Sequence, residues 1–363
     1  MLFRSAGAPI ASLPSDNPAN WTPNVQDGQV NTIWQIGNTV LIGGTFTQIA
    51  DSTLNGGAVY DQAYLAAFDA TTGLVDADFD PVLTGEVEAI IPSADPASFY
   101  VAGDFNQVDG VNRRKIARLT VADGSIVTAF KTDGTNGRIR DLRLVDGTLY
   151  AAGLFTQVEG ASRTYLASLD PTTGDVTTKL NLTLSGLHNG GTGKVIKIDA
   201  TPDGDKLLIT GNFTSIEGQS RPQVALIDIG NTPATLSAWQ TNWYTSTCAT
   251  VFDSYMRDLD ISEDGTYAVI STTGAYRPQP SACDTISRFE LTDEVADIDP
   301  TWVSVTGGDT TYAVEIHDGV AYVGGHMRWL NNPFSGDRHG AGGVARPGMG
   351  ALDVETGLPY SWN

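Results

Sequence analysis

The sequence is poor in the residues on which several large classes of protein depend. Its 363 residues include two cysteines and four histidines, and 21 lysines and arginines stand against 42 aspartates and glutamates, for a formal charge of −21. A field of this sign repels phosphate groups, which argues against nucleic acid and anionic membrane surfaces as partners. Because no run of about 18 apolar residues occurs, the sequence also predicts no membrane insertion.

Common catalytic and metal-binding motifs are missing as well. The sequence contains no G-x-S-x-G elbow, no Walker loop, no D-x-D-x-D-G calcium loop and no H-x-x-x-H spacing. We therefore predict no cofactor and no metal site, and no catalytic residue is assigned. Residues 1–20 hold no apolar segment of the kind found in secretory signals, so no signal peptide is visible in this chain.

Against these absences stand 40 glycines, 31 aromatic residues and a short motif that repeats along the chain. The copies are IGGTFTQI (42–49), VAGDFNQV (101–108), AAGLFTQV (151–158), ITGNFTSI (209–216), TYAVISTTGAY (266–276) and, more loosely, VGGHMRWL (323–330). Glycines that we align with one another lie 50 to 63 residues apart, at Gly44, Gly103, Gly153, Gly211, Gly274 and Gly325. This self-similarity indicates a repeat architecture.

Each repeat contains four short strand patterns and no helical periodicity. A second landmark, as in YLAAFDATTG and YLASLDPTTG, is an apolar run that ends in a tight glycine turn, and the fourth pattern ends at a large apolar side chain: Phe79, Phe130, Trp239, Trp302 or Trp362. Four-stranded units of this length predict an all-β fold, a β-propeller of four-stranded blades.

Six complete repeats are visible, and the ends of the chain bear on the number of blades. The segment NWTPN at 20–24 matches the SWN that ends the chain, and we interpret it as the fourth strand of a further blade. We therefore favour a seven-bladed ring, of which this chain is a fragment, over a six-bladed ring with a redundant strand. Residues 1–19 are expected to form an N-terminal extension, and residues 20–363 a single propeller domain.

The repeat also resembles a known family. The pattern GG-x-F-T-x-V-x-G-x-x-R-x-x-L-A-x-L-D-x-T-T-G, clearest at 153–174, resembles the roughly sixty-residue "delta-sixty" propeller repeat of secreted actinobacterial proteins. Residues 248–276 and 324–353 look like the same group. The resemblance implies a propeller fold and a secreted, extracellular location. It implies no reaction and no catalytic residues.

The two cysteines form a disulfide, remain as two thiols or contribute to a metal site. Cys248 lies in the connection that enters the fifth repeat, and Cys283 lies in the connection between the second and third strands of that repeat. Strand order brings both connections to the same face of the blade. We therefore predict a disulfide, which indicates an oxidising compartment.

The long connections of a propeller with this strand order all lie on one face, where binding residues are expected. Arginine, histidine and tryptophan gather there in the last two repeats, against the overall negative charge. Arginine binds carboxylates through two parallel hydrogen bonds, and tryptophan stacks on sugar rings and on arginine. The same side chains also pin long loops in many propellers. The candidate ligand-binding residues are Asp253, Tyr255, Arg257, Tyr276, Arg277, His326, Arg328, Trp329, Arg338 and His339.

Two functions from different classes fit these features. The first is a secreted, non-catalytic propeller that binds a glycan or an extracellular protein through its long-loop face. The alternative is a carbohydrate-active enzyme, a lyase or hydrolase of an acidic polysaccharide, in which Arg257 and Arg328 hold a uronate and His326 or Tyr255 moves a proton. Because propellers host both, the fold does not choose between them. Convergence of these four side chains on one pocket would favour the enzyme.

Overall fold

The computed structural model describes residues 13–15, 17–292 and 297–362. Most of the predicted N-terminal extension therefore lies outside the described residues. The chain forms two compact units. One contains Ala19–Leu184 and Asn231–Ala234, and the other consists mainly of Ser185–Gly230 and Thr235–Asn363.

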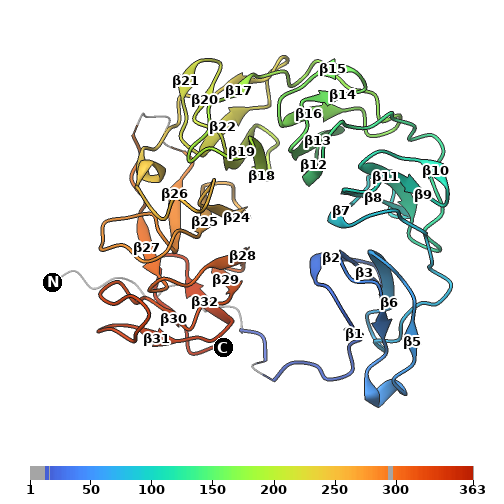
Figure 1. The fold of residues 1–363 in the computed structure, drawn as a ribbon, viewed down its shortest axis with the longest axis horizontal. Coiled ribbons are helices and arrows are strands. Elements are labelled where there is room, and N and C mark those ends of the chain that lie inside the picture. The colour runs from blue at the N-terminus through green and yellow to red at the C-terminus, as the bar shows by residue number, and fades with distance from the viewer. Residues whose placement is uncertain (1–12, 16, 293–296, 363) are drawn as a thin grey trace. The chain divides into compact units, whose positions relative to one another are not determined.

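Three antiparallel sheets, which we call repeats 1 to 3, make up the unit of residues 19–184 (Figure 1). In each sheet the strands pair in chain order, and one β-bridge joins the third strand to a short fourth segment. The sheets are β2 (Val30–Ile36), β3 (Thr39–Gly44) and β6 (Leu65–Asp69); β7 (Val87–Pro92), β8 (Ser98–Gly103) and β11 (Ile116–Thr120); and β12 (Ile139–Val145), β13 (Thr148–Gly153) and β16 (Leu166–Leu169).

The other unit contains repeats 4 to 6, which follow the same plan. Repeats 4 and 5 have a full fourth strand, and repeat 6 has a β-bridge instead. The sheets are β18 (Lys194–Ala200), β19 (Lys206–Asn212), β22 (Val224–Asp228) and β23 (Thr235–Leu236); β24 (Met256–Ile261), β25 (Tyr267–Thr272), β26 (Thr285–Glu290) and β27 (Trp302–Val305); and β28 (Thr311–His317), β29 (Val320–Gly325) and β32 (Met349–Asp353).

Helical structure in the described part of the chain is limited to two single turns, η1 (Thr53–Asn55) and η2 (Trp243–Thr245). The predicted all-β propeller fold of four-stranded repeats is therefore confirmed, whereas the number of blades stays a prediction. No helix among the described residues has the length and apolar character needed to cross a membrane.

The core lies between successive sheets. One cluster of buried side chains joins repeats 1 and 2 and another joins repeats 2 and 3, and corresponding clusters join repeats 4 to 5 and 5 to 6. Because the second strand of each sheet is covered on both faces, its sequence is a continuous run of apolar and small residues, as in SFYVAG and YAVIST, rather than an alternation. The predicted large anchors Phe79, Phe130 and Trp239 are fully buried.

The first strand of every repeat carries a register shift at its start. The shifts fall between residues 30/32, 87/89, 139/141, 195/197, 256/258 and 311/313. Such a bulge turns the side chain of the extra residue away from the regular alternation of the strand. In repeat 5 the extra residue is Arg257.

In each unit a layer of small hairpins covers one side of the repeats, which we call the loop face of that unit. It is built from the connections between second and third strands, together with the segments that precede each first strand. Its strands are β1 (Asn24–Val25), β4 (Ile49–Ala50), β5 (Val59–Tyr60), β9 (Gln107–Val108), β10 (Val111–Asn112), β14 (Gln157–Val158), β15 (Ala161–Ser162), β17 (Leu184–Ser185), β20 (Ser215–Ile216), β21 (Gln219–Ser220), β30 (Trp329–Leu330) and β31 (Val344–Ala345). The long connections are therefore ordered secondary structure in five repeats.

The segment at 20–24 takes part of the place that the sequence predicts, because Trp21 stands where the other repeats have the large side chain of a fourth segment. The strand β1, however, pairs with β4 in the loop-face hairpin of repeat 1. Trp21 lies against Gly73, at the turn after the third strand of that repeat. Phe130 lies against Gly174 and Trp302 against Gly357 in the same way, so Trp21 fills for repeat 1 the position that a preceding repeat fills elsewhere.

Candidate functional site

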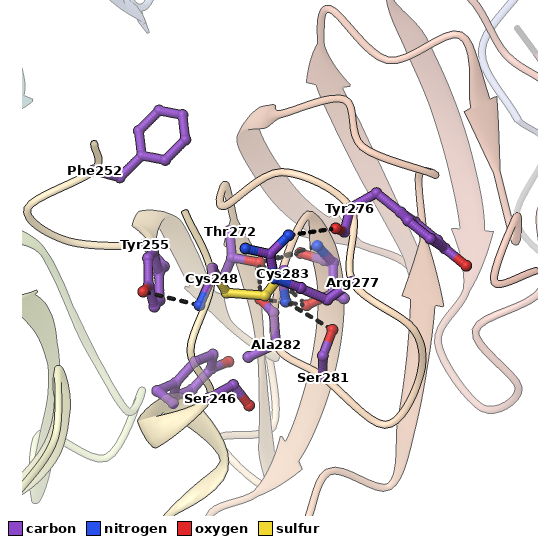
Figure 2. The surroundings of a disulfide bond; sticks show 12 residues. Ser246, Cys248, Phe252, Tyr255, Thr272, Tyr276, Arg277, Ser281, Ala282 and Cys283 are labelled. Atoms are coloured by element: carbon purple, nitrogen blue, oxygen red, sulfur yellow. Dashed lines mark hydrogen bonds between the residues drawn. A yellow bond between two sulfur atoms is a disulfide. The ribbon is translucent and has the colours of Figure 1, made fainter. Parts of the chain in front are cut away.

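Repeat 5 lacks the loop-face hairpin and carries the disulfide in its place (Figure 2). Cys248 and Cys283 are bonded, with their Cα atoms 5.7 Å apart, which confirms the predicted pairing. The alignment of Gly274 with the other repeat glycines is wrong by two residues, because Thr272 pairs with Met256 just as Gly44 pairs with Val30.

Gly274 therefore corresponds to the buried phenylalanine of the motif, represented by Phe46, Phe105, Phe155 and Phe213. A Cβ atom on Gly274 would lie 2.6 Å from the Cβ of Cys248 and 2.8 Å from its Sγ. The disulfide thus occupies the space that an aromatic ring fills in four other repeats. The substitution of a covalent bond for a phenylalanine explains why the motif is hardest to align in repeat 5.

Tyr255 and Asp253 have structural partners on the chain around this disulfide. Tyr255 is fully buried, and its hydroxyl accepts hydrogen bonds from the amide of Cys248 (3.0 Å; Figure 2) and the side chain of Asn189 (2.9 Å). Asp253 forms an ion pair of 2.6 Å with Lys194. Tyr255 is therefore not available as a proton donor to a ligand at the surface.

Arg328 is held by two carboxylates. Its Nε and Nη2 donate to the two oxygens of Asp309 at 2.8 and 2.9 Å, and Nη2 also donates to Asp337 at 2.7 Å. These hydrogen bonds raise the pKa of Arg328 well above its ordinary value. The guanidinium also lies 4.4 Å from the ring of Trp329. The two parallel donors of Arg328 are thus bound to Asp309, whereas the sequence predicted that they bind a ligand.

The loop that follows Arg328 is organised by a buried side chain that sequence reasoning did not single out for this role. The amide of Asn332 donates to the carbonyls of Ser335 and Arg338 and accepts from the amide of Gly340. His339, which is exposed, lies 6.4 Å from the ring of Trp329 and bonds the carbonyl of Gly343. The side chain of Arg338 is exposed to solvent.

The remaining candidates lie at the ends of strands in repeats 5 and 6. Tyr276 points away from the disulfide (Figure 2), packs against Gly336 and donates to the carbonyl of Pro333. Arg277 is exposed. Arg257 lies 5.6 Å from the ring of Phe252, and His326 lies 5.7 Å from the ring of Tyr312.

The structure thus joins only part of the predicted set. Arg328, Trp329 and His339 lie together in repeat 6, and Arg257 and His326 both act on the charge of one buried carboxylate, Asp284. Tyr255 is buried beneath the disulfide, and Arg328 is engaged by Asp309. Two of the four side chains of the enzyme hypothesis, Tyr255 and Arg328, are therefore engaged within the protein, and the hypothesis itself stays a prediction.

A second site, which the sequence analysis missed, lies on the loop face of repeats 2 and 3. Two hollows of about 460 and 670 Å³ share Asn112, Arg114, Thr135 and Asn136, and we call them together the polar groove. Its further lining residues are Thr84, Asn106, Gln107, Lys115, Thr132, Asp133, Gly134, Gln157, Glu159 and Gly160. Side-chain amides and hydroxyls dominate this lining, which also contains two cations and two carboxylates.

Most of the groove is held rigid by hydrogen bonds within the protein. Asn136 accepts from the amides of Thr156 and Gln157, and Glu159 accepts from the hydroxyl of Thr132 and the amide of Val176. Arg114 differs: it is exposed, and among the described residues its side chain has neither a hydrogen bond nor an ion pair. The cue in the sequence is the pair Arg113–Arg114, where repeats 3, 4 and 6 carry one arginine.

Arg113 itself has a structural role that recurs. The guanidinium groups of Arg113, Arg163, Arg221 and Arg346 each donate to the carbonyl of the preceding residue. Arg163, Arg221 and Arg346 also reach a carbonyl of the fourth strand or segment, and Gln62 does so in repeat 1. The arginine of the motif is therefore a clamp between the loop-face hairpin and the outer edge of its sheet.

Comparison with known proteins supports the fold. Residues 100–130 match a family model described as a β-propeller domain of unknown function (DUF5122). The β-propeller domain of Cps50 (Swd1) from Myceliophteria thermophila is similar in structure, with a TM-score of 0.51 and 12% identity over 92% of this chain and 97% of that domain. A computationally designed protein, Ika8, gives a TM-score of 0.49 at 11% identity, covering 92% of this chain and 86% of its own. No curated protein matches the sequence significantly.

Proposed function

We propose that this β-propeller is a secreted, non-catalytic protein that binds a carboxylated glycan in the polar groove of its loop face. The observation that carries the proposal is the unpaired guanidinium of Arg114 in a groove lined by side-chain amides. The guanidinium of Arg114 presents two parallel donors of the spacing that a carboxylate accepts.

The rest of the lining supports a sugar as the body of that ligand. Sugar hydroxyls both donate and accept, and the amides of Asn112, Asn136 and Gln157 offer both kinds of group. Because Asn136 is fixed by bonds to the backbone of the neighbouring hairpin, little ordering is needed when a ligand binds. Glu159, one of the two carboxylates in the lining, is occupied as a hydrogen-bond acceptor within the protein. This supports binding rather than catalysis.

The disulfide supports a secreted location. Disulfides persist in oxidising compartments and are rare in the cytosol. Both cysteines of the chain are used in this one bond, which lies buried in repeat 5.

The proposal is tested by calorimetric titration with oligogalacturonate and with its fully methyl-esterified form. We expect the wild type to bind the acidic form and not the ester, and Arg114→Ala to weaken binding about tenfold or more, as the loss of one charge-assisted bidentate contact implies. The matched control is Lys131→Ala, which removes the same charge from an exposed residue outside the lining.

Equal binding of the acidic and esterified oligosaccharides would contradict the proposal, as would an Arg114→Ala variant with wild-type affinity. Turnover of the oligosaccharide would overturn the non-catalytic part alone.

A further inference from the structure

Asp284, at the start of the third strand of repeat 5, is buried without a partner. Its residue is 1% exposed, and neither carboxylate oxygen has a hydrogen-bond partner in the described structure. Burial, followed by the negative charge of Asp309, raises the pKa of Asp284 to about 6, although His326, Arg257 and the backbone amide of Gly274 lower it. These three groups therefore offset only part of the cost of placing a carboxylate here.

The main chain holds Asp284 and Asp309 next to each other. The amide and the hydroxyl of Thr306 both donate to the carbonyl of Asp284 at 3.1 Å, and the same hydroxyl also donates to the carbonyl of Asp309. The amide of Asp309 in turn donates to the hydroxyl of Thr306 at 3.2 Å. Thr306 thus fixes two carboxylate-bearing residues from different strand ends on the loop face of repeats 5 and 6.

The side chain at the corresponding position has partners in repeats 2 and 4. Gln223 fills it in repeat 4, where its side-chain oxygen accepts from the hydroxyl of Ser254 and the amide of Tyr255. Lys115 fills it in repeat 2 and forms an ion pair of 2.6 Å with Asp104. In each case the side chain is matched to the charge and hydrogen-bonding groups around it. Asp284 faces a second carboxylate instead.

The two carboxylates differ in what neutralises them. Both oxygens of Asp309 accept from Arg328, so Asp309 has its own counter-charge. Asp284 has none in contact. A buried carboxylate without hydrogen bonds is costly to ionise, and a cation bound to it removes that cost.

We propose that Asp284, assisted by Asp309, binds a divalent cation through oxygen ligands on the loop face of repeats 5 and 6. Carboxylate oxygens are the ligands that Ca²⁺ prefers, and Ca²⁺ tolerates the irregular coordination that strand ends provide. The site is separate from the polar groove, and this inference does not depend on the glycan proposal. Arg257 and His326 act on the charge of Asp284 but form no hydrogen bond with it. They therefore offset part of the negative charge of the site and leave the carboxylate oxygens available as ligands.

The test is the melting temperature of the full chain in EDTA, in CaCl2 and in NaCl of matched ionic strength, together with calorimetric titration with Ca²⁺. We expect Ca²⁺ at about a hundredfold excess over its Kd to raise the Tm of the wild type by about 3–6 °C beyond NaCl, with one binding site. In Asp284→Asn this shift is lost, while the Tm in EDTA is higher than that of the wild type because the buried charge is gone. Asparagine also tolerates the positive φ of 52° at this position.

The matched control is Glu263→Gln. Glu263, His317 and Asp318 are exposed, and their ligand atoms lie within 4.8 Å of one another, so this cluster is the competing place for a metal among the described residues. Glu263→Gln is expected to keep the full Ca²⁺ shift. A wild type with no Ca²⁺-specific shift overturns the proposal, and so does an Asp284→Asn variant that keeps the shift. Loss of the shift in Glu263→Gln alone would place the metal at the exposed cluster and equally overturn it.

Discussion

At the scale of single residues, several carboxylates of this protein satisfy backbone groups. The first strand of each sheet has one edge without a pairing strand, and its amides need acceptors. Asp199 accepts from the amide of Ile261, and Asp260 accepts from that of Ile316. Each first strand of repeats 4 and 5 thus supplies the acceptor for the first strand of the following repeat.

This arrangement predicts an unusual dependence of stability on pH. Burial, followed by the charges of Asp199 and Glu315, raises the pKa of Asp260 to about 8 from an ordinary 3.8. The folded protein therefore holds a proton that the unfolded chain releases, and the stability from this group is fully present below about pH 4 and is lost as the pH rises through 8. We expect the Tm of the wild type to fall between pH 5 and pH 8.

The variant Asp260→Asn checks this expectation. Asparagine keeps an acceptor for Ile316 and donates to Asp199, so the fold is retained while the titration is removed. The decline of Tm from pH 5 to pH 8, measured by circular dichroism, should be clearly smaller in Asp260→Asn than in the wild type. Asp318→Asn, a change at an exposed carboxylate, should leave the decline as it is. Equal slopes in all three proteins would show that Asp260 titrates normally.

At the scale of elements, the arginine of the repeat motif connects the loop-face hairpin to its sheet in repeats 3, 4 and 6. Arg221 is 4% exposed, and it donates to the carbonyls of Ser220 and Ser237 and to Gln240 at 2.7 to 2.8 Å. Arg221→Ala leaves these buried acceptors without a donor, and we expect a loss of about 2–4 kcal/mol in the free energy of unfolding.

Denaturation in urea measures this loss. Arg221→Lys should recover only part of it, because an ammonium group cannot span three acceptors in the plane of a guanidinium. The exposed Arg277→Ala change should alter stability by less than about 0.5 kcal/mol. If Arg221→Ala were as mild as Arg277→Ala, the arginine would not be a clamp.

The clamp also shows what the sequence could and could not predict. The four-strand repeat and the disulfide follow from local patterns, because glycine turns, apolar runs and cysteine placement are all visible in the printed order of residues. The roles of the arginines are not. Arg328 meets Asp309 across 19 residues, and only the fold shows that its guanidinium is occupied while that of Arg114 is not.

The misaligned Gly274 has a related cause. In repeat 5 a glycine follows the strand as in the other repeats, but it comes two residues later. Only the strand register shows that it stands where a phenylalanine belongs. Because a disulfide replaces the phenylalanine in repeat 5, the side chains at this position are not similar to those of the other repeats.

At the scale of the whole molecule, the net charge of −21 affects stability as well as the choice of partners. Repulsion among many carboxylates opposes the compact state, and salt screens that repulsion within about 10 Å at 0.1 M. We expect an increase in NaCl from 20 to 300 mM, in EDTA, to raise the Tm by about 2–5 °C. A fall in Tm would show instead that ion pairs such as Arg138–Glu88 dominate.

The disulfide of repeat 5 carries one more consequence. Repeats 1 to 4 each have a buried phenylalanine at this position, so their packing does not depend on the redox state of the surroundings. Repeat 5 becomes complete only once its two sulfurs have been oxidised. A reducing environment would therefore replace the covalent bond beside Gly274 by two separate thiols, while the phenylalanines of the other repeats stay unchanged.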